Sequence, residues 1–153
     1  MALQQISSEC EVDVFETQDI GGTDFWTVGL GATAGWVDMA LYDLFYAQVA
    51  VGATWNAADQ LDELHLEQAT TAIGGGVKEV CNINQVAANT AGEIFVLECK
   101  GEDLDVDGGF HYVRCYAAEV GNTGQDDISI TYVRANCRNA TDDLVGATQA
   151  IKA

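Results

Sequence analysis

Three runs of β-branched and aromatic residues in the second half of the chain constrain its fold more than any other feature. They span residues 93–99, 110–116 and 128–134, and acidic turns that contain glycine separate them. Runs of this length and composition, interrupted by turn residues, are typical of successive antiparallel strands. This part of the sequence therefore predicts a β-sheet, and no catalytic motif lies within it.

The rest of the chain continues the same pattern. In residues 44–52 the apolar side chains recur at every second position, which predicts a half-buried strand. These side chains are Phe45, Ala47, Val49 and Val51. All such runs together give about seven to nine short strands at a spacing of roughly ten residues. We therefore expect an all-β antiparallel β-sandwich that is jelly-roll-like.

Two segments stay open at this stage. Residues 61–69 alternate like a strand, but a short helix over residues 57–68 also fits, because Leu61 and Leu64 are three positions apart. The run 10–16 also alternates, and it is either an edge strand or an arm that lies on a neighbouring subunit.

The 153 residues, of which 48% are hydrophobic, fit one globular domain. We expect an extended N-terminal arm or edge strand over residues 1–22, a β-sandwich domain over residues 23–138 and a short C-terminal tail over residues 139–153. The sequence shows neither an apolar run of the roughly 18–20 residues that cross a bilayer nor a secretion signal at its start. We therefore expect the protein to be made in the cytoplasm.

The charge balance excludes several kinds of partner. Twenty-four acidic residues face six lysines and arginines, which gives a formal net charge of −18. A surface with this charge repels the phosphates of nucleic acids and the head groups of anionic lipids. We therefore expect no nucleic acid and no membrane among the partners.

Scarce cations and clustered aromatic side chains provide the candidate interface residues. The arginines either pair with nearby carboxylates of the same chain or anchor a contact to an adjacent acidic subunit. The aromatic side chains belong either to the core or to an interface, where such residues concentrate. The candidates are Arg114, Arg134, Arg138, Trp26 and Trp36.

The acidic turn at residues 103–108 matches the opening of a calcium loop. Acids stand at positions one, three and five and a glycine at position six, and these residues are Asp103, Asp105, Asp107 and Gly108. The twelfth position, which should carry a bidentate glutamate, holds Arg114. We therefore expect a solvated turn without a metal, with Leu104 and Val106 pointing inward.

The two histidines form no recognisable catalytic constellation, because such a site needs a positioned partner beside the histidine. His65 stands between Glu63 and Glu67, which is a weak pattern for a metal site or a pH sensor. We expect His65 to be an exposed strand residue and His111 to be structural. The sequence predicts neither an enzyme nor a cofactor.

The five cysteines include no C-x-x-C pair of the kind found in zinc ribbons. They are Cys10, Cys81, Cys99, Cys115 and Cys137. Cys99 and Cys115 lie in apolar strand runs, and we expect them to be small buried hydrophobic residues in a reducing cytosol. The alternative is an intrachain or intersubunit disulfide that forms later, outside the cell.

Residues 102–114 resemble a signature of small virion proteins from tailed bacteriophages. Their sequence from Leu104 to Arg114 fits the pattern L-D-V-D-x-G-F-x-x-V-R of that family. Residues 64–70 and 74–80 are similar to an upstream segment of the same family, L-Q-E-A-T-D followed by G-x-G-x-K-x-I. The resemblance covers roughly residues 36–138 and is carried by a strand–turn–strand signature.

The resemblance implies a non-enzymatic β-sandwich subunit of the virion. The role that it implies first is a capsid decoration or cement protein that binds the outer surface of the major capsid shell and stabilises it. The implied partners are the major capsid protein and further copies of the chain, as a dimer or trimer. The alternatives are another virion component, such as a major coat, head-fibre base or tail protein, or a carbohydrate- or calcium-binding β-sandwich module.

Overall fold

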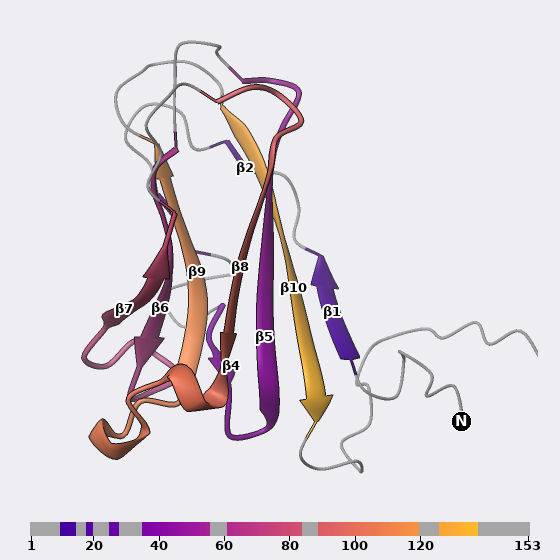
Figure 1. The fold of residues 1–153 in the computed structure, drawn as a ribbon. Helices are drawn as coiled ribbons and strands as arrows, with labels where there is room; N and C mark the ends of the chain where they lie inside the picture. Colours follow the sequence, from indigo (N-terminus) through magenta and orange to yellow (C-terminus); the bar gives the residue numbers. More distant parts are fainter. Residues whose placement is uncertain are drawn as a thin grey trace, which may run out of the picture.

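The computed structural model describes residues 10–14, 18–19, 25–27, 35–55, 61–83, 89–119 and 126–137. In this part of the chain, two antiparallel sheets pack face to face (Figure 1). We call them sheet A, with the strand order β1-β10-β5-β8, and sheet B, with the order β3-β9-β6-β7. In addition, β2 pairs with β10 and β4 pairs with β9. The predicted all-β antiparallel sandwich is confirmed.

The long strands overlap the runs expected from the sequence, although their bounds differ by a few residues, and the two-residue strands β2 and β4 were not expected. Sheet A contains β1 (Cys10–Val14), β2 (Gln18–Asp19), β5 (Tyr42–Val51), β8 (Ile94–Lys100) and β10 (Asp127–Cys137). Sheet B contains β3 (Phe25–Thr27), β4 (Val37–Asp38), β6 (Leu61–Ala69), β7 (Lys78–Asn82) and β9 (Tyr112–Glu119). Between β8 and β9 lie two short 3-10 turns, η2 (Gly101–Asp103) and η3 (Val106–Gly108).

The pairing of the strands is nested along the chain. Strands β1 and β2 pair with β10, β3 and β4 pair with β9, β5 pairs with β8, and β6 pairs with β7. Two further pairings, β10 with β5 and β9 with β6, complete the two layers. Each sheet therefore combines strands from both halves of the chain.

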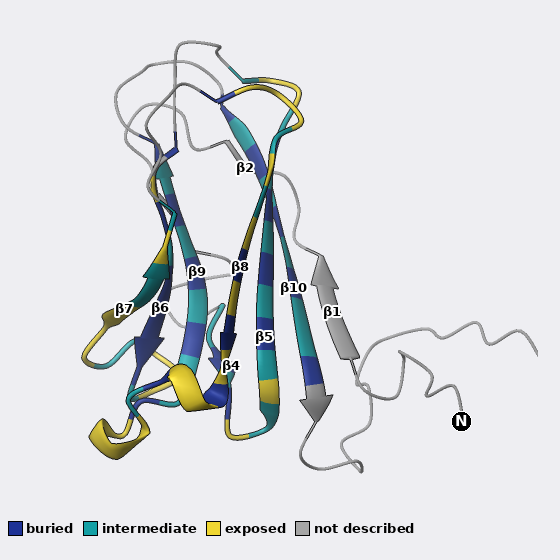
Figure 2. Ribbon diagram, in the orientation of Figure 1, coloured by how far each residue is buried: buried dark blue, intermediate teal, exposed yellow. Residues whose placement is uncertain are grey.

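Alternation of side chains along the strands builds the core between the sheets (Figure 2). On β5, the four side chains predicted to share a face are all buried, as expected for a sheet with one face packed against a second layer. Tyr132 of β10 is fully buried, and its ring meets that of Phe45 edge to face at 4.7 Å. The Tyr132 hydroxyl accepts a hydrogen bond of 2.7 Å from the backbone N–H of Cys115, which ties sheet A to sheet B.

The structure settles both segments that the sequence left open. Residues 61–69 form strand β6 and not a helix, because their backbone pairs with β7 on one side and with β9 on the other. Within the run 10–16, residues 10–14 form β1 at the edge of sheet A, paired with β10 of the same chain. Within the same expected arm, residues 18–19 form β2, which also pairs with β10. The rest of the arm, and the whole expected tail over 139–153, lie outside the described residues.

The acidic turn corrects one expectation. Leu104 is buried, as predicted, but Val106 is 60% exposed instead of pointing inward. The reason is local: η3 begins at Val106, and Asp105 caps this turn by accepting a hydrogen bond of 3.0 Å from the N–H of Gly108. Gly109 then ends the turn with φ at 83°, a left-handed conformation that favours glycine.

Candidate interaction surfaces

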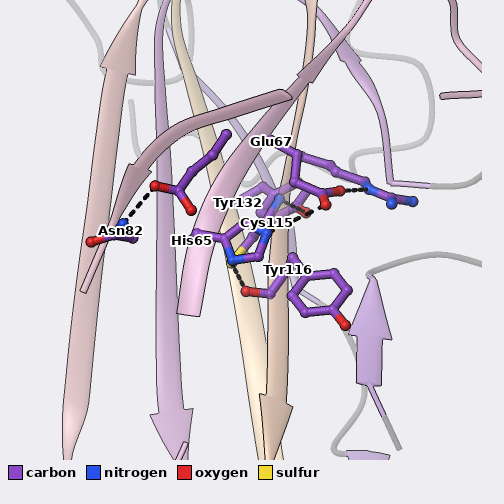
Figure 3. Close-up of polar contacts among 8 residues, drawn as sticks. His65, Glu67, Asn82, Cys115, Tyr116 and Tyr132 are labelled. Atoms are coloured by element: carbon purple, nitrogen blue, oxygen red, sulfur yellow. Dashed lines mark hydrogen bonds and ion pairs between the residues drawn. The ribbon is translucent and has the colours of Figure 1, made fainter. Parts of the chain in front are cut away.

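A cluster of polar side chains lies on the outer face of sheet B, where β6 and β9 pair (Figure 3). Glu67 stands opposite Arg114, and His65 stands opposite Tyr116. The Nε of Arg114 donates a hydrogen bond of 2.7 Å to Oε2 of Glu67, while Nε2 of His65 lies 3.3 Å from Oε1 of Glu67. The rings of His65 and Tyr116 are stacked, with centroids 4.6 Å apart.

Trp36 completes this cluster from the segment before β4. The guanidinium of Arg114 lies over the Trp36 ring, 4.4 Å from its centroid, in a cation–π contact. Gly74 also packs close to this ring, since a Cβ built on it would lie 3.3 Å from Cζ2 of Trp36. The structure thus brings together two of the predicted interface residues, Trp36 and Arg114, as partners of each other within one chain.

The electrostatics of the cluster favour an ionised pair. The side chains of Glu67 and Arg114 are only 11% and 16% exposed. Burial raises the pKa of the Glu67 carboxyl, but hydrogen bonds from His65 and Arg114 outweigh it and hold that pKa below its ordinary value. We therefore interpret the cluster as a set of intrachain contacts that stabilise the packing of β6, β9 and the segment that carries Trp36. His65, with a side chain 14% exposed, belongs to it, so the expectation of an exposed histidine is wrong.

Among the other predicted interface residues, only Arg134 has a described side chain. Arg134 lies on sheet A, where its guanidinium is 5.2 Å from the centroid of the Tyr42 ring. The backbone of Trp26 belongs to β3 and pairs with Ala117 of β9. Arg138 lies outside the described residues. Of the candidates whose side chains are described, Trp36 and Arg114 therefore lie together at sheet B, whereas Arg134 lies on sheet A.

The carboxylates of the acidic turn stabilise the turn itself. Asp105 accepts hydrogen bonds from the N–H of Gly108 and, at 2.5 Å, from Nζ of Lys78. The bond from Lys78 is the main reason why the pKa of Asp105 is lowered. Oδ2 of Asp103 accepts a bond of 2.7 Å from the N–H of Lys100. Among the described residues, no three His, Cys, Asp or Glu side chains gather in a way that could hold a metal ion, and this includes Asp107.

The cysteines with described side chains are buried to different degrees. Cys99 and Cys115 are 2% and 0% exposed, which confirms that they are small core residues. Burial raises the pKa of the Cys99 thiol to about 12 and also raises the pKa of the Cys115 thiol. Cys81 on β7 is half-buried, and its thiol pKa is raised by burial as well. Thiolate chemistry at neutral pH is therefore suppressed at these three side chains.

The outer face of sheet A carries a surface that the sequence reasoning missed. Three rows of side chains run across β10, β5 and β8, according to the strand register, and every member of them but one is uncharged. The uncharged members, which we call the neutral face, are Tyr46, Gln48, Ala50, Ile94, Val96, Ser129, Thr131 and Val133. The one charged member is Glu98, which stands opposite Tyr46.

Two aliphatic side chains dominate this surface. Ile94 and Val96 of β8 are 60% and 46% exposed, and β8 is the last strand in the described order of sheet A. Only the part of the neutral face on β5 was visible in the sequence, because the positions that alternate with the buried Phe45, Ala47 and Val49 carry no charge either. The outward face of such a sheet usually carries charged side chains among its polar ones, so this uncharged run departs from the common pattern.

Comparisons of the chain with models of protein families, with curated proteins and with solved structures returned no match. The resemblance to bacteriophage virion proteins therefore stays a prediction. Among the described residues, no helix is long and apolar enough to span a membrane.

Proposed function

We propose that the chain is a structural protein of a tailed-bacteriophage virion, and specifically a capsid decoration protein. In this role it binds the outer surface of the major capsid shell and stabilises the shell without catalysing a reaction. The observation that carries the proposal is the nested pairing of the strands, because viral capsid proteins use folds of this kind. The same chain carries the signature at residues 102–114 that resembles small virion proteins.

The nested pairing supports a jelly roll. If β1 and β2 count as one edge strand, and β3 and β4 as another, eight strands pair first with last, second with seventh, third with sixth and fourth with fifth. This is a long antiparallel hairpin folded over into two layers of four strands. Viral capsid and lectin domains both use such double-sheet jelly rolls, so the fold is compatible with the role but does not define it.

The net charge supports a position on the outside of a shell. A net charge of −18 disfavours contact with packaged nucleic acid, whose phosphates would repel it. Attachment to a shell requires contact area and shape complementarity instead of a deep pocket. The outer face of a sheet can supply such an area.

The state of the nucleophilic and basic side chains supports a non-enzymatic role. His65 is stacked on Tyr116 and bonded to Glu67 inside the polar cluster. The thiols of Cys99 and Cys115 are buried with raised pKa values. An active site needs such groups in a concave site with a free path to substrate, and these side chains are occupied by packing.

The test is the copy number of the chain in purified virions. We expect it in a fixed ratio to the major capsid protein, as quantified by gel densitometry or mass spectrometry with labelled peptides. We also expect that particles from which the chain is stripped lose their DNA at a lower temperature, and that adding the purified chain restores the original value. A few copies per particle would indicate a tail or fibre component, and absence from virions would refute a structural role.

A further inference from the structure

The neutral face stands out because of the charge on the rest of the molecule. Exposed carboxylates occur on both sheets and in the turns, among them Asp43 of β5 in sheet A, Glu63 of β6 in sheet B and Glu102 of η2. With a net charge of −18, two copies of the chain repel each other in most relative orientations. Contact through an uncharged patch avoids both the direct repulsion and the cost of desolvating carboxylates.

Symmetry narrows the choice of partner. In a two-fold dimer the same patch of both subunits meets itself, so a patch of one charge sign always faces its own sign. On an acidic chain, an uncharged patch is therefore the surface best suited to a two-fold contact. The neutral face has this property, and its exposed Ile94 and Val96 supply apolar area to bury.

We propose that the neutral face of sheet A is a self-association surface that packs against the same face of a second copy of this chain. The proposal does not depend on the virion role. The contact consists mainly of Ile94 and Val96 of each subunit, with the partly buried side chains of β5 and β10 beside them on one side. Glu98 lies at its margin.

The size of the face sets the strength of the contact. Three strands at a spacing of about 4.8 Å and five residues at about 3.4 Å each give a flat area of roughly 14 Å by 17 Å. This is well below the roughly 800 Å² per partner that stable complexes bury. We therefore expect a weak dimer that forms reversibly as the concentration rises, and not an obligate one.

The salt dependence distinguishes this contact from one held by ion pairs. Salt screens the repulsion between two acidic subunits, and at about 1 M it does so within a few ångströms. Packing of uncharged side chains does not lose strength on screening. The dimer should therefore become stronger as salt rises, whereas a contact that uses arginines as anchors should become weaker.

The experiment is sedimentation velocity on the full chain over a hundredfold range of concentration, at low and at high NaCl. We expect a concentration-dependent dimer that is favoured at high salt. Ile94→Glu places like charges against each other across the two-fold axis and should weaken the dimer by about tenfold or more. The matched control is Ile73→Glu, because Ile73 in the β6–β7 turn is 68% exposed and lies outside the neutral face. It receives the same change and should leave the dimer unchanged.

Both substitutions are at exposed positions, and equal thermal midpoints for the two variants and the wild type will show that the fold is retained. A chain that stays monomeric at every concentration and salt would overturn the proposal. So would a dimer that Ile94→Glu leaves intact, one that both variants weaken equally, or one that salt dissociates. A chain that is monomeric but still binds the capsid shell would refute the self-association proposal and would support the virion role.

Discussion

Removal of the Arg114 side chain tests the interpretation of the outer cluster on sheet B. Arg114→Ala deletes the 2.7 Å bond to Glu67 and the cation–π contact to Trp36 at once. A hydrogen bond to a charged group contributes about 1.5–3 kcal/mol, and a cation–π contact contributes about 0.5 kcal/mol when exposed and about 2 kcal/mol when desolvated. The expected loss in the free energy of unfolding is therefore about 2–5 kcal/mol. Glu67 keeps its contact with His65 in this variant. The loss of stability is therefore smaller than for a buried charge that has no partner left.

Urea denaturation followed by tryptophan fluorescence measures this loss directly. The thermal midpoint should also fall, by about 2–4 °C for each kcal/mol in a chain of this size. The matched control is Lys100→Ala, because Lys100 forms a 3.7 Å ion pair with Glu102 in which both side chains are more than half exposed. That pair should contribute under about 1 kcal/mol. If Arg114→Ala lowers the free energy of unfolding no more than Lys100→Ala does, the cluster does not stabilise the fold. Arg114 would then again be a candidate for a contact with another subunit.

Three further predictions concern the core, a turn and the response to acid. Tyr132→Phe removes the acceptor for the N–H of Cys115 and should cost about 1–3 kcal/mol in urea denaturation, and an unchanged midpoint would show that water replaces the hydroxyl. Gly74→Ala should destabilise more than Gly92→Ala, since both glycines have positive φ but only the first would press a Cβ on Trp36; equal losses would contradict this contact. Because the pKa of Glu67 is lowered in the folded state, its contribution to stability is present above the unfolded value near 4.5 and is lost as the pH falls through the folded one. Glu67→Gln should therefore flatten the acid limb of the stability curve, and two parallel curves would exclude this assignment.

Much of the fold was accessible from the sequence because strand periodicity depends on short-range alternation. The buried face of β5 and the burial of Cys99 and Cys115 follow from that alternation alone. The conformation of β6 did not follow from it, because its leucines fit both periods and only the pairing with β7 and β9 decides. The prediction that Val106 points inward was wrong for a related reason. Val106 lies in a turn whose direction is set by the cap from Asp105, and side-chain alternation does not apply to a turn.

The polar cluster was only partly accessible. Glu67 and His65 were recognised as neighbours along one strand, but their partner Arg114 is 47 positions further on and reaches them through the β6–β9 register. Register is set by long-range pairing, which a single sequence does not specify. For the same reason the neutral face could not be assembled, because its three rows combine residues around positions 48, 95 and 131.

Self-association and a contact with a capsid shell cannot both use the neutral face, and this makes the two proposals separable. A neutral face that is covered by a second copy is not free to lie on a shell, so a dimeric decoration protein must bind the shell through other residues. In that case Ile94→Glu weakens the dimer in solution. It then lowers occupancy on particles only because a monomer has one contact with the shell where a dimer has two. If the neutral face itself lies on the shell, Ile94→Glu removes the chain from particles altogether while Ile73→Glu does not. The ratio of particle occupancy between these two variants therefore decides whether the neutral face binds a second copy of the chain or the capsid shell.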